Sequence, residues 1–445
     1  GGVVQRCRGS KVQRFKGSGV QRFRRIKASR LEVQLVTACM SCMHRKTRRI
    51  EGFFVGLVCL SCFGFCFDTP AFSDVGTRTS AAEPAKQAHL DPTWQYLQRT
   101  VSLQGGIVAN YQQYANATVM DDGEKEDFTA CISPQLEMTW EPVEQGSLYA
   151  RLRYTKNRVD LAQKGIVLAN LLETNVSDKD NGRIRLQKLY YTQKLMNDHA
   201  FVAFGKTDGE TYLDTNAFAN DSRTQFMGQP LVNNPMLDDE DEYAPFVALG
   251  VTPIRDLHLL VLGQSSSWPL VSQHKDIWEN MLGHPLVAAQ ATFSPQLTGH
   301  EGHYRLYGWL QSYDHPSLTG PGYKMGWGIG LSLDQWVTRD MGLFARVGHN
   351  NPHVYEVPWF WSAGISVRGL VPRREADTFG LGISGLKANP DTPHDGTEIH
   401  LEAYYRIRLS SHFFVSPDFQ YVLNPLGNND ETGIFASMLR GELCF

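Results

Sequence analysis

The stretch Thr397-Glu-Ile-His-Leu-Glu-Ala-Tyr-Tyr-Arg-Ile-Arg-Leu409 alternates between apolar and polar side chains. Successive side chains of a β-strand point to opposite faces, so the segment has one apolar face and one face of mostly ionisable groups. The segment is long for a soluble strand and suits a tilted strand that crosses a bilayer. This pattern is typical of a transmembrane barrel with a wet interior, and a long strand of a soluble sandwich is the alternative.

The composition of the whole chain allows a barrel and excludes a helical membrane protein. The 445 residues include 40 glycines and 11% aromatic residues, with a mean hydropathy of −0.31. Outside residues 52–67 no apolar run approaches the roughly 18 residues that a membrane helix needs. Residues 1–73 hold 14 of the 43 basic residues and 3 of the 46 acidic residues. The remaining chain is therefore acidic, which argues against a nucleic-acid partner.

The first hundred residues differ from the rest. Residues 1–42 repeat a basic motif every eight residues, which could be a nucleic-acid-binding arm. We interpret them instead as an upstream extension outside the working protein, because residues 43–73 have the charged start, apolar core and small-residue cleavage site of a signal peptide. We expect export and cleavage near Ser73. Residues 74–100 then form a polar segment with a short helix over Leu90–Arg99, ahead of a barrel over 101–445.

From residue 101 onward, alternating segments recur with turn residues between them. Sixteen such segments predict an antiparallel, 16-stranded transmembrane barrel of the outer-membrane type, all-β in class, with short turns at the periplasmic end and longer loops outside. The predicted strands are 101–115, 127–140, 146–159, 183–195, 199–206, 243–251, 256–263, 284–295, 301–313, 323–337, 340–349, 358–370, 378–387, 397–409, 413–423 and 432–445.

The barrel region contains two cysteines, Cys131 and Cys444. By parity both face inward, and they lie two strands apart once the barrel closes. Two strand spacings amount to about 10 Å, which is too far for a disulfide. We therefore predict two free thiols.

Three groups of motifs resemble the carbohydrate-selective, OprB-type porins of Gram-negative outer membranes. The motifs are Phe204–Asp208 with Asp214–Asp221 and Asn233–Pro235, Gly364–Gly369 with Pro372–Asp377, and Glu402–Arg406 with Pro417–Tyr421 and Asn424–Pro425. The resemblance implies a barrel that lets sugars and other small polar solutes diffuse passively. Its expected partners are outer-membrane lipid and lipopolysaccharide, the barrel-assembly machinery, which would recognise the terminal Phe445, and small sugars. Both a monomer and a homotrimer remain open.

A sugar pore needs hydrogen-bonding groups that replace part of the hydration of the sugar without holding it too tightly. Parity places such groups on the inner face of several strands. The predicted pore-lining or solute-binding residues of the strands are Arg151, Arg153, Arg183, Arg185, Arg305, Trp309, Arg346, Arg368, Glu398 and Glu402. The recurring arginines predict a basic ladder that favours polar or anionic solutes. The alternative is that charge in the lumen means only that the interior is wet.

The loop Thr207–Glu242 is long, and a loop of this length without regular structure is usually functional. We expect it to fold into the barrel and narrow it, with four residues at or near the constriction: Asp214, Asn216, Asn220 and Asp221. The alternative is that these side chains only cap turns inside the loop. The run Asp238–Glu242 could bind a divalent cation, although a solvated loop end is the simpler interpretation.

Other classes of protein find less support. An outer-membrane hydrolase would need a serine, a histidine and an acid brought together, and no nucleophile-elbow motif is found. An adhesin or other structural barrel is the second alternative. No motif indicates a cofactor, a metal site or a catalytic residue. Arg374 and Asp377, in a predicted turn, are expected to pair and stabilise that turn.

Overall fold

The computed structural model describes residues 92–118, 123, 125–158, 161–176, 180–237, 243–265, 285–297 and 299–445. The chain divides into two compact units, Gly1–Phe72 and Ser73–Phe445, and all described residues belong to the second. The leader, its cleavage site and the acidic run Asp238–Glu242 lie outside the described residues. Within the described part no helix has the length and apolar character to cross a membrane.

The described part contains sixteen long strands and one two-residue strand. The strands are β1 (Val101–Ala115), β2 (Phe128–Val143), β3 (Gly146–Asn157), β4 (Arg183–Leu195), β5 (Ala200–Thr207), β6 (Ala244–Ile254), β7 (Leu257–Ser265), β8 (Pro285–Phe293), β9 (Gln296–Leu297), β10 (His300–Pro316), β11 (Tyr323–Trp336), β12 (Met341–Asn350), β13 (Trp359–Arg368), β14 (Thr378–Lys387), β15 (Thr397–Arg408), β16 (Phe413–Leu423) and β17 (Ile434–Cys444). The helical elements are α3 (Pro92–Thr100), η1 (Gly209–Thr211), α4 (Gln229–Val232) and η2 (Pro425–Gly427).

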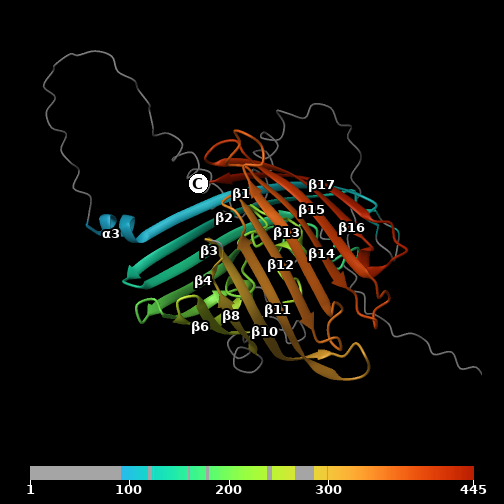
Figure 1. Cartoon of the computed structure of the whole chain (residues 1–445), viewed down its shortest axis with the longest axis horizontal. Helices are drawn as coiled ribbons and strands as arrows, with labels where there is room; N and C mark the ends of the chain where they lie inside the picture. The colour runs from blue at the N-terminus through green and yellow to red at the C-terminus, as the bar shows by residue number, and fades with distance from the viewer. Residues whose placement is uncertain are drawn as a thin grey trace, which may run out of the picture. The chain divides into compact units, whose positions relative to one another are not determined.

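The long strands form one closed antiparallel sheet (Figure 1). Each pairs with the next along the chain, and β17 pairs back with β1, with Ala109 opposite Gly441. Closure matters because a strand edge in lipid would leave backbone polar groups without partners. The prediction of sixteen long strands is confirmed, and β1 and β4 have the predicted bounds. The predicted helix over Leu90–Arg99 is α3, whose Tyr96 hydroxyl donates to the Pro142 carbonyl at 3.0 Å.

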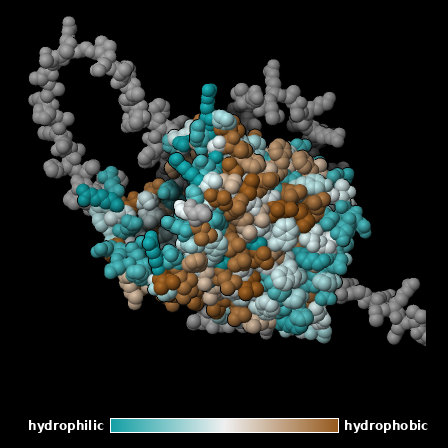
Figure 2. Space-filling model, in the orientation of Figure 1, coloured by the Kyte–Doolittle hydropathy of each residue, from teal (hydrophilic) through white to brown (hydrophobic). Residues whose placement is uncertain are grey.

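The two faces of the barrel follow the alternation in the sequence. On β15, Glu398, His400 and Glu402 are buried inside, whereas Leu401 is exposed outside. Figure 2 shows hydrophobic residues gathered over the middle of the visible barrel face, with hydrophilic residues towards its ends. Short turns such as 255–256 and 409–412 alternate with long connections such as 158–182 and 208–243. We call the two ends of the barrel the short-turn end and the long-loop end.

Two long connections fold into the barrel and fill much of it. The first is the β3–β4 loop (158–182), whose Leu161 and Leu171 pack on Val422 and Ile434 of the inner wall. The second is the β5–β6 loop (208–243), which we call the long loop. The predicted inward folding of this loop is thus observed, and the apolar core of the protein lies between these loops and the wall.

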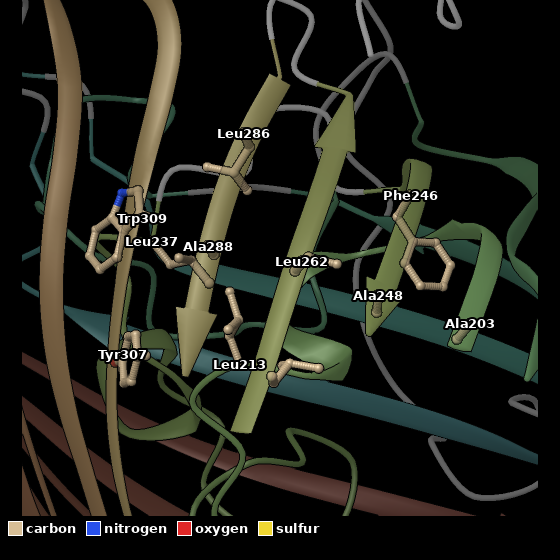
Figure 3. Packing of buried hydrophobic residues seen from close by; sticks show 11 residues of the cluster. Ala203, Leu213, Leu237, Phe246, Ala248, Leu262, Leu286, Ala288, Tyr307 and Trp309 are labelled. Atoms are coloured by element: carbon tan, nitrogen blue, oxygen red, sulfur yellow. The ribbon is translucent and has the colours of Figure 1, made fainter. Parts of the chain in front are cut away.

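The long loop packs against two stretches of the inner wall. Leu213 and Leu237 contact Tyr307, Trp309 and inward residues of β5–β8 (Figure 3). Phe218 lies against β12, where a Cβ added at Gly342 would come within 2.0 Å of its ring. Glycine on this inner face therefore makes room for the loop, which explains part of the high glycine content.

Candidate functional site: the channel and its constriction

The open space of the barrel lies between the long loop and the wall formed by β1 to β4. It is a cavity of about 900 Å³ that reaches Ser411 and His412 at the short-turn end. Its wall side chains are mostly polar and include both charges and aromatic rings: Gln104, Gln135, Glu137, Tyr149, Arg151, Arg153, Lys188 and Tyr190. The long loop contributes the opposite side: Asp208, Glu210, Thr211, Thr215, Asn220, Asp221, Ser222, Arg223, Thr224, Val232, Asn233 and Tyr243.

A second cavity of about 190 Å³ continues towards the long-loop end, where it meets Asn175, Val176 and Leu237. Six residues line both cavities: Arg153, Glu173, Asp208, Glu210, Asn233 and Tyr243. A residue that lines both cavities lies at the boundary between them. We therefore take these six residues as the candidate constriction between the two cavities.

Arg346 fixes the first half of the long loop. Its side chain is 1% exposed and points inward from β12, and its Nε is 3.0 Å from the Asp214 carboxylate. Its Nη2 also donates to the carbonyls of Asp214, Ala219 and Val232. A buried carboxylate is tolerated when it is paired and hydrogen-bonded, and Asp214 also accepts a bond from the Asn234 amide at 2.7 Å.

Two carboxylates of β15 hold the two inserted loops. Glu402 accepts hydrogen bonds from the backbone amides of Met227 and Gly228 in the long loop, at 2.6 and 2.8 Å. Four residues earlier, Glu398 accepts bonds from Leu168 and Ala169 of the β3–β4 loop. Because inward residues of one strand recur at every second position, a single strand can anchor two neighbouring loops.

Arg440 of β17 completes the anchoring of the long loop. Its Nη1 donates to the carbonyls of Ser222 and Gln225, and its Nε donates to Glu442 at 3.0 Å. The inner wall thus presents cations to loop carbonyls and carboxylates to loop amides. Both pairings satisfy backbone groups that would otherwise be buried without partners.

Ion pairs also neutralise much of the charge that faces the channel. Arg151 Nε lies 3.0 Å from Glu137, and Lys188 Nζ lies 2.9 Å from Asp208 across the gap between wall and loop. Burial, followed by the neighbouring Asp208 charge, raises the pKa of Glu210 to about 8. At neutral pH Glu210 is therefore largely uncharged, and its Oε1 accepts a bond from Asn233 Nδ2 at 2.5 Å.

Four of the predicted site residues line the main cavity: Arg151, Arg153, Asn220 and Asp221. Their contact with solute remains a prediction. Asp221 also caps its own turn, because it accepts bonds from the Arg223 amide and the Thr224 hydroxyl. Both interpretations of the loop residues therefore apply to this side chain.

Seven others are buried inside the barrel but line neither cavity; the first two belong to the long loop, and the other five face inward on their strands as parity predicts: Asp214, Asn216, Arg305, Trp309, Arg346, Glu398 and Glu402. Their burial is incompatible with solute contact in this conformation, so that part of the prediction is corrected. They hold the loops or pair with the wall; Arg305, for instance, pairs with Asp334 at 2.5 Å.

The last three predicted residues lie towards the ends of their strands. Arg183 is exposed, and Arg185 pairs with Asp180 at 2.5 Å. Arg368 stacks on Trp336, with its guanidinium carbon 4.5 Å from the ring centroid. None of the three lines either cavity of the channel.

The predicted basic ladder stays a prediction, but ion pairs reduce the net charge of four of its seven arginines. Arg151, Arg185, Arg305 and Arg346 each have a carboxylate partner. Alternation shows which face an arginine occupies, but it does not show which acid faces it from the next strand or from a loop. The arginines therefore do not add up to an anion-selective surface along the whole barrel.

The sequence interpretation missed Lys188 and Tyr190 because it continued a simple alternation along β4. A register shift in the pairing of β3 with β4, between Arg151 and Leu152, places Lys188 opposite Arg151. An extra residue on one strand reverses the parity beyond it. The acids Asp208 and Glu210 were missed because they lie in the loop, where no periodicity points to them.

The turn predicted around Arg374 is confirmed. Arg374 donates to both oxygens of Asp377 at 2.7 and 2.9 Å, and Asp377 also accepts bonds from Tyr405 and the Arg408 amide. Burial opposes the charge of Asp377, but the bonds from Arg374 and the Arg408 amide hold its pKa below the ordinary value. Of the described cysteines, Cys131 is buried and Cys444 half-buried, and both are free.

A closed barrel of long strands, with inserted loops that leave a polar cavity between described loop and wall residues, is the architecture of an outer-membrane channel. Residues 146–445 match the family described as "Carbohydrate-selective porin, OprB family". The chain therefore belongs to the OprB family of carbohydrate-selective porins, and it forms a channel for the passive diffusion of sugars across an outer membrane. Family and fold indicate a channel rather than an enzyme.

The high-pH structure of Pseudomonas putida OprB is similar to this chain, with a TM-score of 0.68 and 15% sequence identity over 79% of this chain and 96% of that one. The low-pH structure of the same protein matches with a TM-score of 0.50 and 14% identity, over 79% and 95% of the two chains. At this identity the likeness shows the fold. No curated protein matches.

Proposed function

We propose that sugars cross this barrel along the β1–β4 wall and that the side chains shared by its two cavities select them. The observation that carries this proposal is the balance of charge on the main cavity. Its lining includes four basic side chains and five acidic ones, and one of the acids, Glu210, is largely uncharged at neutral pH. Arg151 with Glu137 and Lys188 with Asp208 form pairs. A path with little net field favours polar solutes of low charge over simple ions.

Aromatic rings beside these pairs suit the apolar faces of sugars. On the wall, the rings of Tyr149 and Tyr190 are tilted against each other by 36° with centroids 5.2 Å apart, and Tyr243 lines both cavities from the end of the long loop. Paired charges next to them offer donors and acceptors that replace hydration without binding too tightly. The anchored loops hold these groups in place.

Proteoliposome swelling with neutral sugars of increasing size tests the proposal, alongside the reversal potential in a KCl gradient. We expect monosaccharides to enter, entry to slow as size increases, and a reversal potential close to zero. Impermeability to glucose would refute the proposal, and so would a strongly anion- or cation-selective reversal potential.

We also propose that residues 43–73 direct export and that the processed barrel inserts beside lipopolysaccharide with the help of the assembly machinery. The short-turn end would then face the periplasm. Support comes from the signal-like sequence and from the terminal Phe445, whose amide bonds to Gly105 and so closes the last strand on the first. Mass spectrometry of the purified membrane protein tests this; an N-terminus upstream of residue 43 would contradict it.

The hydrolase alternative gains no support from the only histidine that lies among inward carboxylates of β15. His400 is buried and its Nε2 is 2.6 Å from Glu398, which is itself bound to loop amides. This histidine lines neither cavity of the channel. We therefore propose a transport function without a catalytic one, and incubation of the purified protein with general ester substrates tests it.

A further inference from the structure

Two arginines meet on the short-turn side of the constriction. Arg153 comes from β3 and Arg223 from the long loop, and both line the main cavity. Both also bind the same wall residue: Arg153 Nε donates to Ser133 Oγ at 2.7 Å, and Arg223 Nη1 donates to the Ser133 carbonyl at 3.1 Å. The two guanidinium groups are therefore close to each other, beside Ser133 on the channel wall.

Neither of these cations forms an ion pair with any described residue, unlike Arg151 and Lys188 of the same cavity. Burial, followed by repulsion from Arg153, lowers the pKa of Arg223 to about 10. The Nη2 group of Arg153 is buried without a hydrogen-bond acceptor. Unsatisfied donors and two like charges in one place indicate that an acceptor with negative charge would be stabilised there.

The carboxylates that line the same cavity have partners of their own, including Glu173, which lines both cavities with Arg153. Glu137 accepts bonds from Gln135 and Arg151, and Asp221 accepts bonds from its own turn. The basic spot is therefore local, within a cavity whose charges otherwise balance. A guanidinium pair of this kind suits the geometry of a carboxylate or a phosphate group better than it suits a hydroxyl group.

We propose that Arg153 and Arg223 form a binding step for one oxyanion group on a passing solute, either the carboxylate of a sugar acid or the phosphate of a sugar phosphate. This inference rests on the proposed function, because the rest of the solute would follow the sugar path. The channel would then carry neutral sugars and retain anionic sugar derivatives for longer. Release remains possible because the other two cations among the described residues that line the main cavity, Arg151 and Lys188, are already paired.

Planar-bilayer recordings of the purified protein test the proposal, with gluconate, glucose 6-phosphate and glucose as blockers of the chloride current. We expect the two anions to halve the current at lower concentrations than glucose does. The substitutions R153Q and R223Q should each raise the half-blocking concentration of the anions about tenfold, the low end for hydrogen bonds to charged groups. Block of R223Q by glucose should stay the same, because Arg223 lines the main cavity but not the smaller one. R153Q removes a residue of the proposed sugar constriction, so only its block by the two anions is compared.

The matched control is R339Q, which removes one positive charge from an exposed turn at the short-turn end and should change nothing. Equal block by glucose and by the two anions in the unaltered protein would overturn the proposal without the need for any substitution. So would half-blocking concentrations within twofold of the unaltered protein in both R153Q and R223Q. If glucose fails to enter liposomes that contain the unaltered protein, the proposed function itself fails, and that outcome is separate from the first two.

Discussion

Replacing Arg346 with alanine should detach the first half of the long loop from the wall and widen the channel. The side chain pairs with Asp214 and donates to three loop carbonyls, all in a site that is 1% exposed. The substitution leaves the Asp214 carboxylate buried without a cation. Breaking a buried pair by removing one partner costs about 3–5 kcal/mol, which shifts the equilibrium between docked and undocked loop by about 10²- to 10⁴-fold.

Single-channel conductance in planar bilayers measures this effect. We expect R346A to conduct more than the unaltered protein, with added current noise from a loop that exchanges between positions. The matched control is R305A, which removes an equally inward arginine from its pair with Asp334, a residue of the wall strand β11 and not of the long loop. Folding of both variants is checked by the heat-dependent mobility of the barrel on gels. If R346A and R305A conduct alike, Arg346 does not hold the constriction in place.

Three further predictions concern groups that line the channel or its turns. Cys444 lines the main cavity whereas Cys131 is buried, so a charged thiol reagent added on the short-turn side should reduce the conductance, and C444S should abolish that effect. Glu210 has a pKa raised to about 8, so it gains charge as pH rises through that value; cation preference should increase between pH 7 and 9, and E210Q should remove the change. Asp377 has a depressed pKa in the folded state. Its pair with Arg374 therefore stabilises the turn fully at pH values above the unfolded pKa of about 4. This stabilisation is lost as the pH falls through the pKa of the folded state. The substitution D377N should therefore lower the thermal unfolding temperature at pH 7 and have little effect in strong acid; equal effects at both pH values would contradict this reasoning.

Much of the barrel could be predicted from the alternation of apolar and polar residues, because one face of each strand contacts lipid and the other contacts water or an inserted loop. The segment around Glu398 and Leu401 shows this, since one register alone places its carboxylates inside. Strand count, strand order and the identity of the inner face all follow from that constraint. The same rule failed beyond Gln187 on β4, where the shifted register of the β3–β4 pair places Lys188 inside.

The role of each inward side chain could not be predicted in the same way. Arg346 and Arg153 both face inward on their strands, yet one is buried beneath the long loop and the other lines the channel. The two arginines differ because of the path of the long loop, whose sequence has no periodic hydrophobic pattern from which that path could be predicted. The face that a residue occupies can therefore be predicted from its strand, whereas its function depends on which loop atoms pack against it.

The division of inward charge into two sets explains how one barrel can be both rigid and weakly selective. Buried ions such as Arg346 and Glu402 bind loop backbone and pair with loop or wall partners, where low dielectric strengthens every bond and penalises any lost partner. Ions on the channel, such as Arg151 with Glu137, are partly hydrated and paired, so they offer contacts without trapping a solute. Changing a buried ion should therefore alter conductance through the position of the loop, whereas changing a channel ion should alter selectivity at nearly constant conductance. A variant of Glu402 that changed ion preference while its conductance stayed the same would show that this division is mistaken.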